Sequence, residues 1–213
     1  MPIAERAKTI AVRAIMVYGP TSLKKWLWDK EFSGTKWDFI NNTKGDCVYA
    51  HLEKFARNGS ILDLGCGPGN TANEVADATY TSYVGVDISD AALAKAVRRT
   101  KECGREGKNT FAQSDFLGYE PTLDFDVILF RESLYHVPFG QVRPILDKFG
   151  KHLKPEGVFI VRLYAGSLES DELKPRVTAK LDLIKREFDV VEATEYATPG
   201  RPTVLVFRPR RKL

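Results

Sequence analysis

The sequence is poor in the residues that build metal centres and disulfide frameworks. Its 213 residues include three cysteines and three histidines. Cys47, Cys66 and Cys103 show no CxxC or Cys/His ligand spacing, and the histidines form no HxxH or HxxxH pair. We therefore expect no metal, and thiols that stay reduced rather than structural disulfides.

Long apolar runs are also missing. No stretch of about 18 apolar residues could span a membrane, and the N-terminus lacks the apolar segment and cleavage site of a signal peptide. We therefore expect a cytoplasmic protein without a membrane partner. The phosphate-binding pattern GxxxxGK[ST] is absent as well, which disfavours a P-loop nucleotidase.

The sequence also has only a small excess of positive charge. The formal net charge is +4, from 32 basic and 28 acidic residues, and much of the excess lies between Arg208 and Lys212. A basic terminus of this kind is usually solvated, although it offers an electrostatic contact for phosphates. Because there is no other basic stripe, a nucleic-acid partner is disfavoured and would depend on Arg208–Lys212.

The sequence does contain a regular alternation of short apolar runs and helical patterns. The expected strands lie at 60–64, 82–88, 109–114, 125–130, 158–164, 188–196 and 203–208. The expected helices lie at 44–57, 70–78, 90–106, 141–153 and 171–187. Strands that alternate with helices indicate a parallel sheet, whereas the last two strands have only turn residues between them. We predict an α/β fold, a single doubly wound, mostly parallel seven-stranded sheet with helices on both faces and an antiparallel C-terminal hairpin.

The length and the 43% hydrophobic content favour one main domain. We expect it over residues 44–208, preceded by a helical, aromatic cap segment over 1–43 and followed by a basic tail over 209–213. The cap segment holds Trp26, Trp28 and Trp37.

Two interpretations of these aromatic residues stay open. In one, they cover the binding site and exclude water, with Trp37 and Phe39 contacting cofactor or substrate. In the other, they only pack an N-terminal helix onto the sheet.

Three alternate glycines, Gly65, Gly67 and Gly69, follow the first expected strand in ILDLGCGPGNT. At the carboxyl end of a strand, a glycine-rich turn lets the backbone approach a ligand where a Cβ atom would collide. Asp87 ends the next strand, at the spacing where a carboxylate accepts both hydroxyls of a ribose. The pattern predicts a nucleoside-containing cofactor.

The same stretch favours a cofactor with a cationic head over a dinucleotide. The glycines run GxGxG rather than GxGxxG, with Asn70 where a dinucleotide turn has its third glycine. Asp63 at the end of the strand would repel a pyrophosphate but attract an ammonium group. We therefore expect an amino acid joined to a nucleoside.

Five segments occur in the order and spacing of one family's motifs. They are ILDLGCGPGNT, VGVDIS, AQSDFLGYE, FDVILFRESLYHVP and LKPEGVFIV. From about Asp46 to Arg208, the chain thus resembles the class I S-adenosylmethionine-dependent methyltransferases, small-molecule type. The resemblance implies a Rossmann-like methyltransferase fold, S-adenosyl-L-methionine as methyl donor and a small-molecule acceptor.

The resemblance also implies how the methionine part of the donor would be held. The backbone around Gly65, Cys66 and Gly67 would face it, and Asp63 would organise that end through hydrogen bonds. The carbonyl of Arg131, just past the fourth strand, would receive the ammonium.

For the nucleoside part, the resemblance implies four further residues. Asp87 would hold the ribose hydroxyls, with Ile88 against the adenine face. Asp115 would accept the adenine amino group, and the backbone of Phe116 would read the edge of the ring. Asp115 also fits a plain junction between strand and loop, where aspartate bonds nearby amides.

The acceptor side is expected in RESLYHVP, after the fourth strand. Glu132 would hold the ammonium of an amine acceptor, whereas His136 would be the general base for a hydroxyl. Alternatively, Tyr135 and His136 form an aromatic wall without a chemical role. The segment lacks the [DNS]PP[YFW] and Pro-Cys patterns of nucleobase methyltransferases.

Methylation of nitrogen or oxygen in a small molecule is therefore the favoured function. Two alternatives remain, an RNA or protein methyltransferase that uses the basic tail, and a cofactor-binding subunit without catalysis. The acceptor and the oligomeric state are not predicted.

Overall fold

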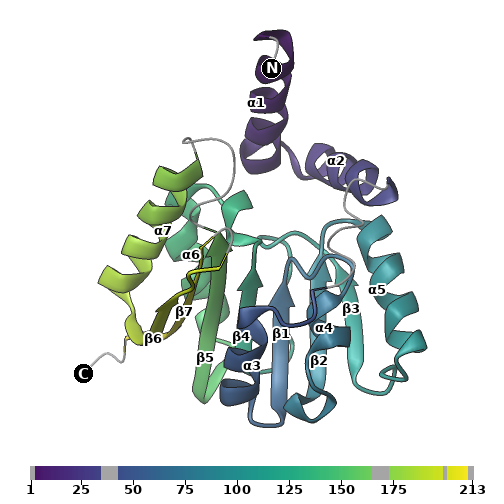
Figure 1. Ribbon diagram of the computed structural model, residues 1–213, viewed down its shortest axis with the longest axis vertical. Helices are drawn as coiled ribbons and strands as arrows, with labels where there is room; N and C mark the ends of the chain where they lie inside the picture. The colour runs from purple at the N-terminus through teal and green to yellow at the C-terminus, as the bar shows by residue number, and fades with distance from the viewer. Residues whose placement is uncertain (1–2, 35–42, 165–172, 199–200, 211–213) are drawn as a thin grey trace.

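A single seven-stranded sheet organises the computed structural model, which describes residues 3–34, 43–164, 173–198 and 201–210. The strand order is β3-β2-β1-β4-β5-β7-β6 (Figure 1). β7 runs antiparallel to both of its neighbours, and the other pairs are parallel. The strands are β1 (Gly59–Leu64), β2 (Tyr80–Asp87), β3 (Asn109–Gln113), β4 (Phe125–Arg131), β5 (Leu153–Tyr164), β6 (Asp189–Glu195) and β7 (Pro202–Arg208). The predicted fold, including the C-terminal hairpin, is confirmed.

Helices cover both faces of the sheet. The helices are α1 (Ile3–Tyr18), α2 (Thr21–Ser33), α3 (Cys47–Ala56), α4 (Asn70–Glu74), α5 (Asp90–Glu102), α6 (Phe139–Gly150) and α7 (Leu173–Glu187), with 3-10 turns η2 (Asp77–Thr79) and η3 (Leu134–His136). α3 and α4 pack in one buried cluster, α5 lies beside α4, and α6 and α7 pack in the cluster on the opposite face. Among the residues described, no helix combines the length and apolarity needed to cross a bilayer.

Side-chain caps set where two of these helices begin. Asp46 accepts a hydrogen bond from the amide of Val48 at 3.0 Å and starts α3, and Ser89 does the same for α5 through Ala92 at 3.1 Å. α5 ends at Glu102, before the predicted stop at Gly107, because Gly104 adopts φ +67° and reverses the chain there.

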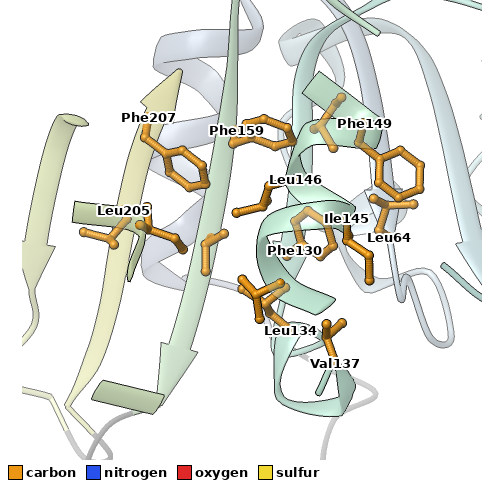
Figure 2. Close-up of a cluster of buried hydrophobic side chains, with 14 of the residues drawn as sticks. Leu64, Phe130, Leu134, Val137, Ile145, Leu146, Phe149, Phe159, Leu205 and Phe207 are labelled. Atoms are coloured by element: carbon orange, nitrogen blue, oxygen red, sulfur yellow. The ribbon is translucent and has the colours of Figure 1, made fainter. Parts of the chain in front are cut away.

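The core cluster on the α6 and α7 face fixes the turn after β4. Leu134, the first residue of η3, and Val137, directly after it, are almost fully buried in this cluster, beside Ile145 and Phe130 (Figure 2). Burial of such side chains contributes about 1.5–3 kcal/mol each. The turn that follows β4 is therefore anchored by its apolar residues, while Tyr135 and His136 between them stay half-buried.

The N-terminal helices lie at the edge of the sheet where the parallel strands end (Figure 1). α2 packs on α5, and α1 extends from it away from the sheet. α2 therefore covers the edge at which an open α/β sheet binds its ligands.

Candidate functional site

The glycine turn after β1 is built from backbone conformations that favour glycine. Gly65, Gly67 and Gly69 have φ values of +83°, +53° and +73°. A Cβ atom on Gly65 would lie 2.4 Å from the Cβ of Ser133, so the turn and the segment after β4 approach each other closely. The amides of Gly65 and Cys66 donate to the carbonyl of Val86 at 2.8 and 3.0 Å, which fixes the turn against β2.

Asp63 carries a carboxylate oxygen without a partner. Its side chain is 1% exposed, and Oδ2 accepts a hydrogen bond from the hydroxyl of Tyr83 at 2.7 Å. Oδ1 is buried and has no hydrogen-bond partner among the described residues. Burial raises the pKa of Asp63 to about 6, against the hydrogen bond from Tyr83, which lowers it. An ammonium group would satisfy both the open oxygen and the charge.

Asp87 joins the glycine turn to the start of α5. Its Oδ2 accepts from the amide of Gly67 at 2.8 Å, and its Oδ1 accepts from the amide of Ser89 at 2.9 Å. Burial raises its pKa, and the amide hydrogen bonds oppose that shift. Each oxygen accepts one amide here, so each keeps capacity for a ribose hydroxyl. Ile88, the next residue, is half-buried.

Asp115 is held from two sides. Oδ1 accepts from the amide of Gly118 at 2.7 Å, as expected at a junction between strand and loop, and Oδ2 accepts from the hydroxyl of Thr21 in α2 at 2.6 Å. Burial acts to raise its pKa, but these hydrogen bonds outweigh it and the pKa is lowered. Phe116 packs edge-on against Phe130, with ring centroids 5.9 Å apart.

Four charged side chains form a buried charge cluster at the ends of β4 and β5, Asp46, Arg131, Glu132 and Arg162. Arg131 pairs with Asp46 at 2.6 Å, and Arg162 pairs with Glu132 at 2.6 Å and with Asp46 at 3.3 Å. The cluster holds two cations and two anions, so the ions compensate one another away from water. The side chain of Arg131 is thus occupied by Asp46, and the predicted role concerns its carbonyl.

Glu132 and Tyr135 belong to the same network. Glu132 has a φ of +57°, its Oε1 accepts from Arg162, and its Oε2 accepts from the hydroxyl of Tyr135. The amide of Tyr164 donates to the Tyr135 oxygen at 2.5 Å. Burial raises the pKa of Glu132, although Arg162 opposes this. Glu132, predicted to hold the ammonium of an amine acceptor, is therefore already paired, and the Tyr135 hydroxyl has no free hydrogen-bonding capacity.

His136 lies against the cap segment. Its ring meets Trp28 of α2 edge-on, with centroids 4.9 Å apart. Burial, together with the charges of Lys180 and Lys24, lowers the pKa of His136 to about 4. The imidazole is therefore neutral at physiological pH and able to accept a proton.

Three residues of α2 that the sequence analysis did not single out contact the predicted cofactor site. Thr21 reaches Asp115, and Asp29 accepts from the hydroxyl of Ser89 at 2.8 Å. The ring of Phe32 lies 3.7 Å from where Gly67 would carry a Cβ atom. Positions 21, 25, 28 or 29, and 32 share one face of the helix. This helical spacing could have indicated that Thr21, Asp29 and Phe32 face the same site.

The structure does not place every residue named in the sequence analysis at the predicted cofactor site. Trp37, predicted to contact the cofactor, and Phe39 lie outside the described residues. Cys66 is buried and burial raises the pKa of its thiol well above the ordinary value, which fits a packing residue rather than a nucleophile. Within the described ranges, no group of three or more His, Cys, Asp or Glu side chains is arranged to hold a metal ion.

The basic tail is partly paired. Arg208 forms an ion pair with Glu156 at 3.1 Å, and Arg210 lies 3.7 Å from Asp189. Arg211 and Lys212 lie outside the described residues.

A family model described as a methyltransferase domain matches residues 45–192. The chain belongs to the class I S-adenosylmethionine-dependent methyltransferases.

Similar proteins differ in what they methylate. The chain is 27% identical over 150 residues to the sterol 24-C-methyltransferase erg6 of Aspergillus fumigatus, a match that covers 65% of this chain and 38% of that protein. It is 26% identical over 136 residues to phosphoethanolamine N-methyltransferase 2 of Caenorhabditis elegans, covering 62% of this chain and 30% of that protein. The matches thus span only about a third of these curated relatives.

Among solved structures, the N-methyltransferase NodS of Bradyrhizobium japonicum in complex with S-adenosyl-l-homocysteine superimposes with a TM-score of 0.69. The identity is 19%, and the superposition covers 88% of this chain and 98% of that chain. This likeness concerns the fold.

The residues of this methyltransferase fit S-adenosylmethionine. The open oxygen of Asp63 suits the ammonium of the methionine part, and the glycine turn leaves the space that Cβ atoms would fill. Asp87 retains capacity for the ribose.

Proposed function

We propose that this methyltransferase transfers the methyl group of S-adenosylmethionine to a nitrogen or oxygen atom of a small molecule. The observation that carries the proposal is the open, buried oxygen of Asp63 beside the glycine turn, with the neutral His136 beyond the end of β4. When bound, the sulfonium supplies an electrophilic methyl group. The chain has then to orient the donor, exclude water and remove one proton.

Donor binding is assigned to residues around β1, β2 and β3 and at the end of β4. Asp63 and the carbonyl of Arg131 would hold the ammonium, and Asp87 would hold the ribose hydroxyls. Asp115 and Phe116 would bind adenine, which requires the adenine amino group to share Asp115 with Thr21 or to displace it. The backbone of Gly65, Cys66 and Gly67 would line the methionine part, and Ile88 the adenine face.

Proton removal is assigned to His136. Both oxygens of Glu132 are occupied and its charge is compensated by Arg162, so it offers little to an ammonium acceptor. His136 is neutral at physiological pH, so its ring can accept the proton of the acceptor without first losing one of its own. This supports a hydroxyl or a neutral amine as acceptor over a permanently cationic molecule. The relatives do not narrow the choice, because one acts on a sterol and another on phosphoethanolamine.

The described part of the 1–43 segment is proposed to act as a cap on this site. α2 contacts Asp115 through Thr21, the start of α5 through Asp29, and His136 through Trp28. These contacts span the donor and the acceptor sides, as a cap that excludes water would require. RNA or protein acceptors held by the tail are less favoured, because Arg208 and Arg210 already face carboxylates.

The test is methyl transfer from labelled S-adenosylmethionine to a panel of amines, phenols, carboxylates and RNA. Binding is first checked by thermal shift, since a ligand at 100 times its dissociation constant stabilises the folded protein by about 2.7 kcal/mol. A thermal shift with transfer to a small molecule supports the proposal. Transfer to RNA alone would contradict it. A shift without transfer to any member of the panel would favour the non-catalytic subunit.

A further inference from the structure

Lys180 of α7 is a buried ammonium without a carboxylate partner. Its side chain is 5% exposed, and no acidic group lies within ion-pair distance in the part of the chain that the structure describes. Burial lowers its pKa to about 8. A buried cation of this kind is unfavourable unless polar groups surround it, so its placement calls for a role.

The ammonium of Lys180 is bound by one turn of the backbone. Nζ donates to the carbonyls of Leu134 at 2.8 Å, Tyr135 at 3.1 Å and Val137 at 2.7 Å. Three N–H donors thus meet three acceptors, which satisfies the group completely. All three carbonyls belong to η3 or to the residue directly after it, more than 40 positions away in sequence.

The turn is therefore held from two sides. The side chains of Leu134 and Val137 are buried in the core cluster (Figure 2), and their carbonyls are held by Lys180. Tyr135 is fixed through its hydroxyl by Glu132 and Tyr164. Among the described residues, the His136 ring meets Trp28 and Tyr135 edge-on but forms no side-chain hydrogen bond, so its place depends on the backbone that carries it.

We infer that Lys180 is a positioning residue of this methyltransferase, whose ammonium fixes the Leu134–Val137 turn and thereby the place of His136 at the acceptor side. This inference rests on the proposed role of His136. It also gives Lys180 a second effect through its charge. The groups that act on His136 are Lys180 from α7, Lys24 and Trp28 from α2, and Tyr135 from its own turn; both charged ones are cations that disfavour an imidazolium.

A neutral His136 suits the reaction. A sulfonium donor carries a positive charge, and an imidazolium beside it would be repelled. Lys180 thus adds to the burial that keeps His136 free of a proton before transfer, while its own ammonium donates to three backbone carbonyls.

The experiment compares Lys180→Met and Lys180→Gln with the wild type, and uses Lys185→Met, an exposed position of the same helix, as matched control. The titration of His136 is followed by NMR, with His136→Gln to assign its signal among three histidines. In both Lys180 variants the midpoint should rise above about 4, while burial and Lys24 keep it below 6.5. Amide exchange at residues 134–137 should become faster, most in Lys180→Met, which removes the ammonium donor from all three carbonyls. Lys185→Met should change neither.

Turnover provides the second readout. The kcat of methyl transfer should fall about tenfold or more in Lys180→Met, with KM for the donor little changed, because a displaced base affects the chemical step. Lys180→Arg keeps a charge and donors and should restore much of the wild-type titration. An unchanged His136 midpoint together with unchanged amide exchange in Lys180→Gln would overturn the inference. Because NMR requires no acceptor, an altered midpoint in a protein without any methyl transfer would refute the proposed function and leave the role of Lys180 intact.

Discussion

The two ends of the site are built differently. The donor half, formed by Asp63, Gly65–Gly69, Asp87 and Asp115, consists of single carboxylates and backbone, and Asp63 retains an unpaired oxygen. In the acceptor half, formed by Glu132–Val137 with Arg162 and Lys180, every charged side chain is held by an ion pair or by hydrogen bonds, although the Nε atom of Arg162 lacks a hydrogen-bond partner among the described residues. The donor half is thus prepared for a charged ligand, whereas the acceptor half is prepared to hold one neutral base in place.

If the donor half and the acceptor half function independently, His136→Gln should slow methyl transfer without weakening donor binding. Methyl transfer should fall by about 100-fold or more, the usual contribution of a general base. Donor affinity, measured by calorimetry, should stay within about twofold, because the donor-binding residues are on other elements. Unchanged turnover would instead make His136 part of a wall, and a large loss of donor affinity would show that the halves are one unit.

Asp63→Asn should have the opposite pattern. Donor affinity should fall about 50-fold, since a hydrogen bond between charged groups is lost. The free protein should be about as stable at neutral pH, because Tyr83 and the charge of Arg131 compensate only part of the cost of burying the carboxylate that is removed. Calorimetry and thermal unfolding measure the two quantities, and Tyr83→Phe, which removes only the partner of Oδ2, is the control. A donor affinity equal to that of the wild type in Asp63→Asn would contradict the proposed role of Asp63 in binding the ammonium.

The pH dependence of donor affinity and of stability provides a second test of Asp63 in the donor half. The pKa of Asp63 is about 6 in the free protein, and a bound ammonium favours the ionised form. Donor affinity should therefore fall by up to about tenfold per pH unit below pH 6. The stability of the free protein should change in the other direction. A carboxyl with a folded pKa above its unfolded value of 3.8 stabilises the folded state fully below pH 3.8, and this contribution is lost as the pH rises through about 6.

Both trends should disappear in Asp63→Asn. Parallel titrations of affinity and thermal stability between pH 5 and 7 check this, and a donor affinity that is constant over that range would exclude Asp63 as the ammonium ligand.

The smallest effect is expected where α2 meets the donor half. Thr21→Val removes the hydrogen bond to Asp115 and frees Oδ2 for the adenine amino group. Donor association, followed by stopped flow, should become faster, and affinity should change by about fivefold or less, the value of one hydrogen bond. Ser22→Ala, at the next and exposed position of α2, is the control. Slower association in Thr21→Val would mean that Thr21 supports donor binding rather than competing with it.

The donor half could be predicted because its determinants are local in sequence. Asp63 and Asp87 end two neighbouring parallel strands, so their spacing alone places them at one edge of the sheet. The turn conformation follows equally directly, since φ values above +50° at three alternate positions favour glycine.

The acceptor half could not be predicted in this way. Arg162 and Lys180 reach Glu132 and η3 across 30 to 46 positions, and nothing in their local sequence indicates those partners. The helix expected over 141–153 also ends earlier than predicted. It is α6, which ends at Gly150, and β5 already begins at Leu153, with a register shift opposite Phe125 and Val127 ahead of its regular pairing.

The buried charge cluster has an evolutionary consequence. Asp46 both caps α3 and serves two arginines, so its loss alone would leave two cations buried with one anion. Single substitutions at Arg131, Glu132 or Arg162 would leave a similar imbalance, which is strongly destabilising. The four positions should therefore be inherited as a block, changing together between lineages and rarely one at a time.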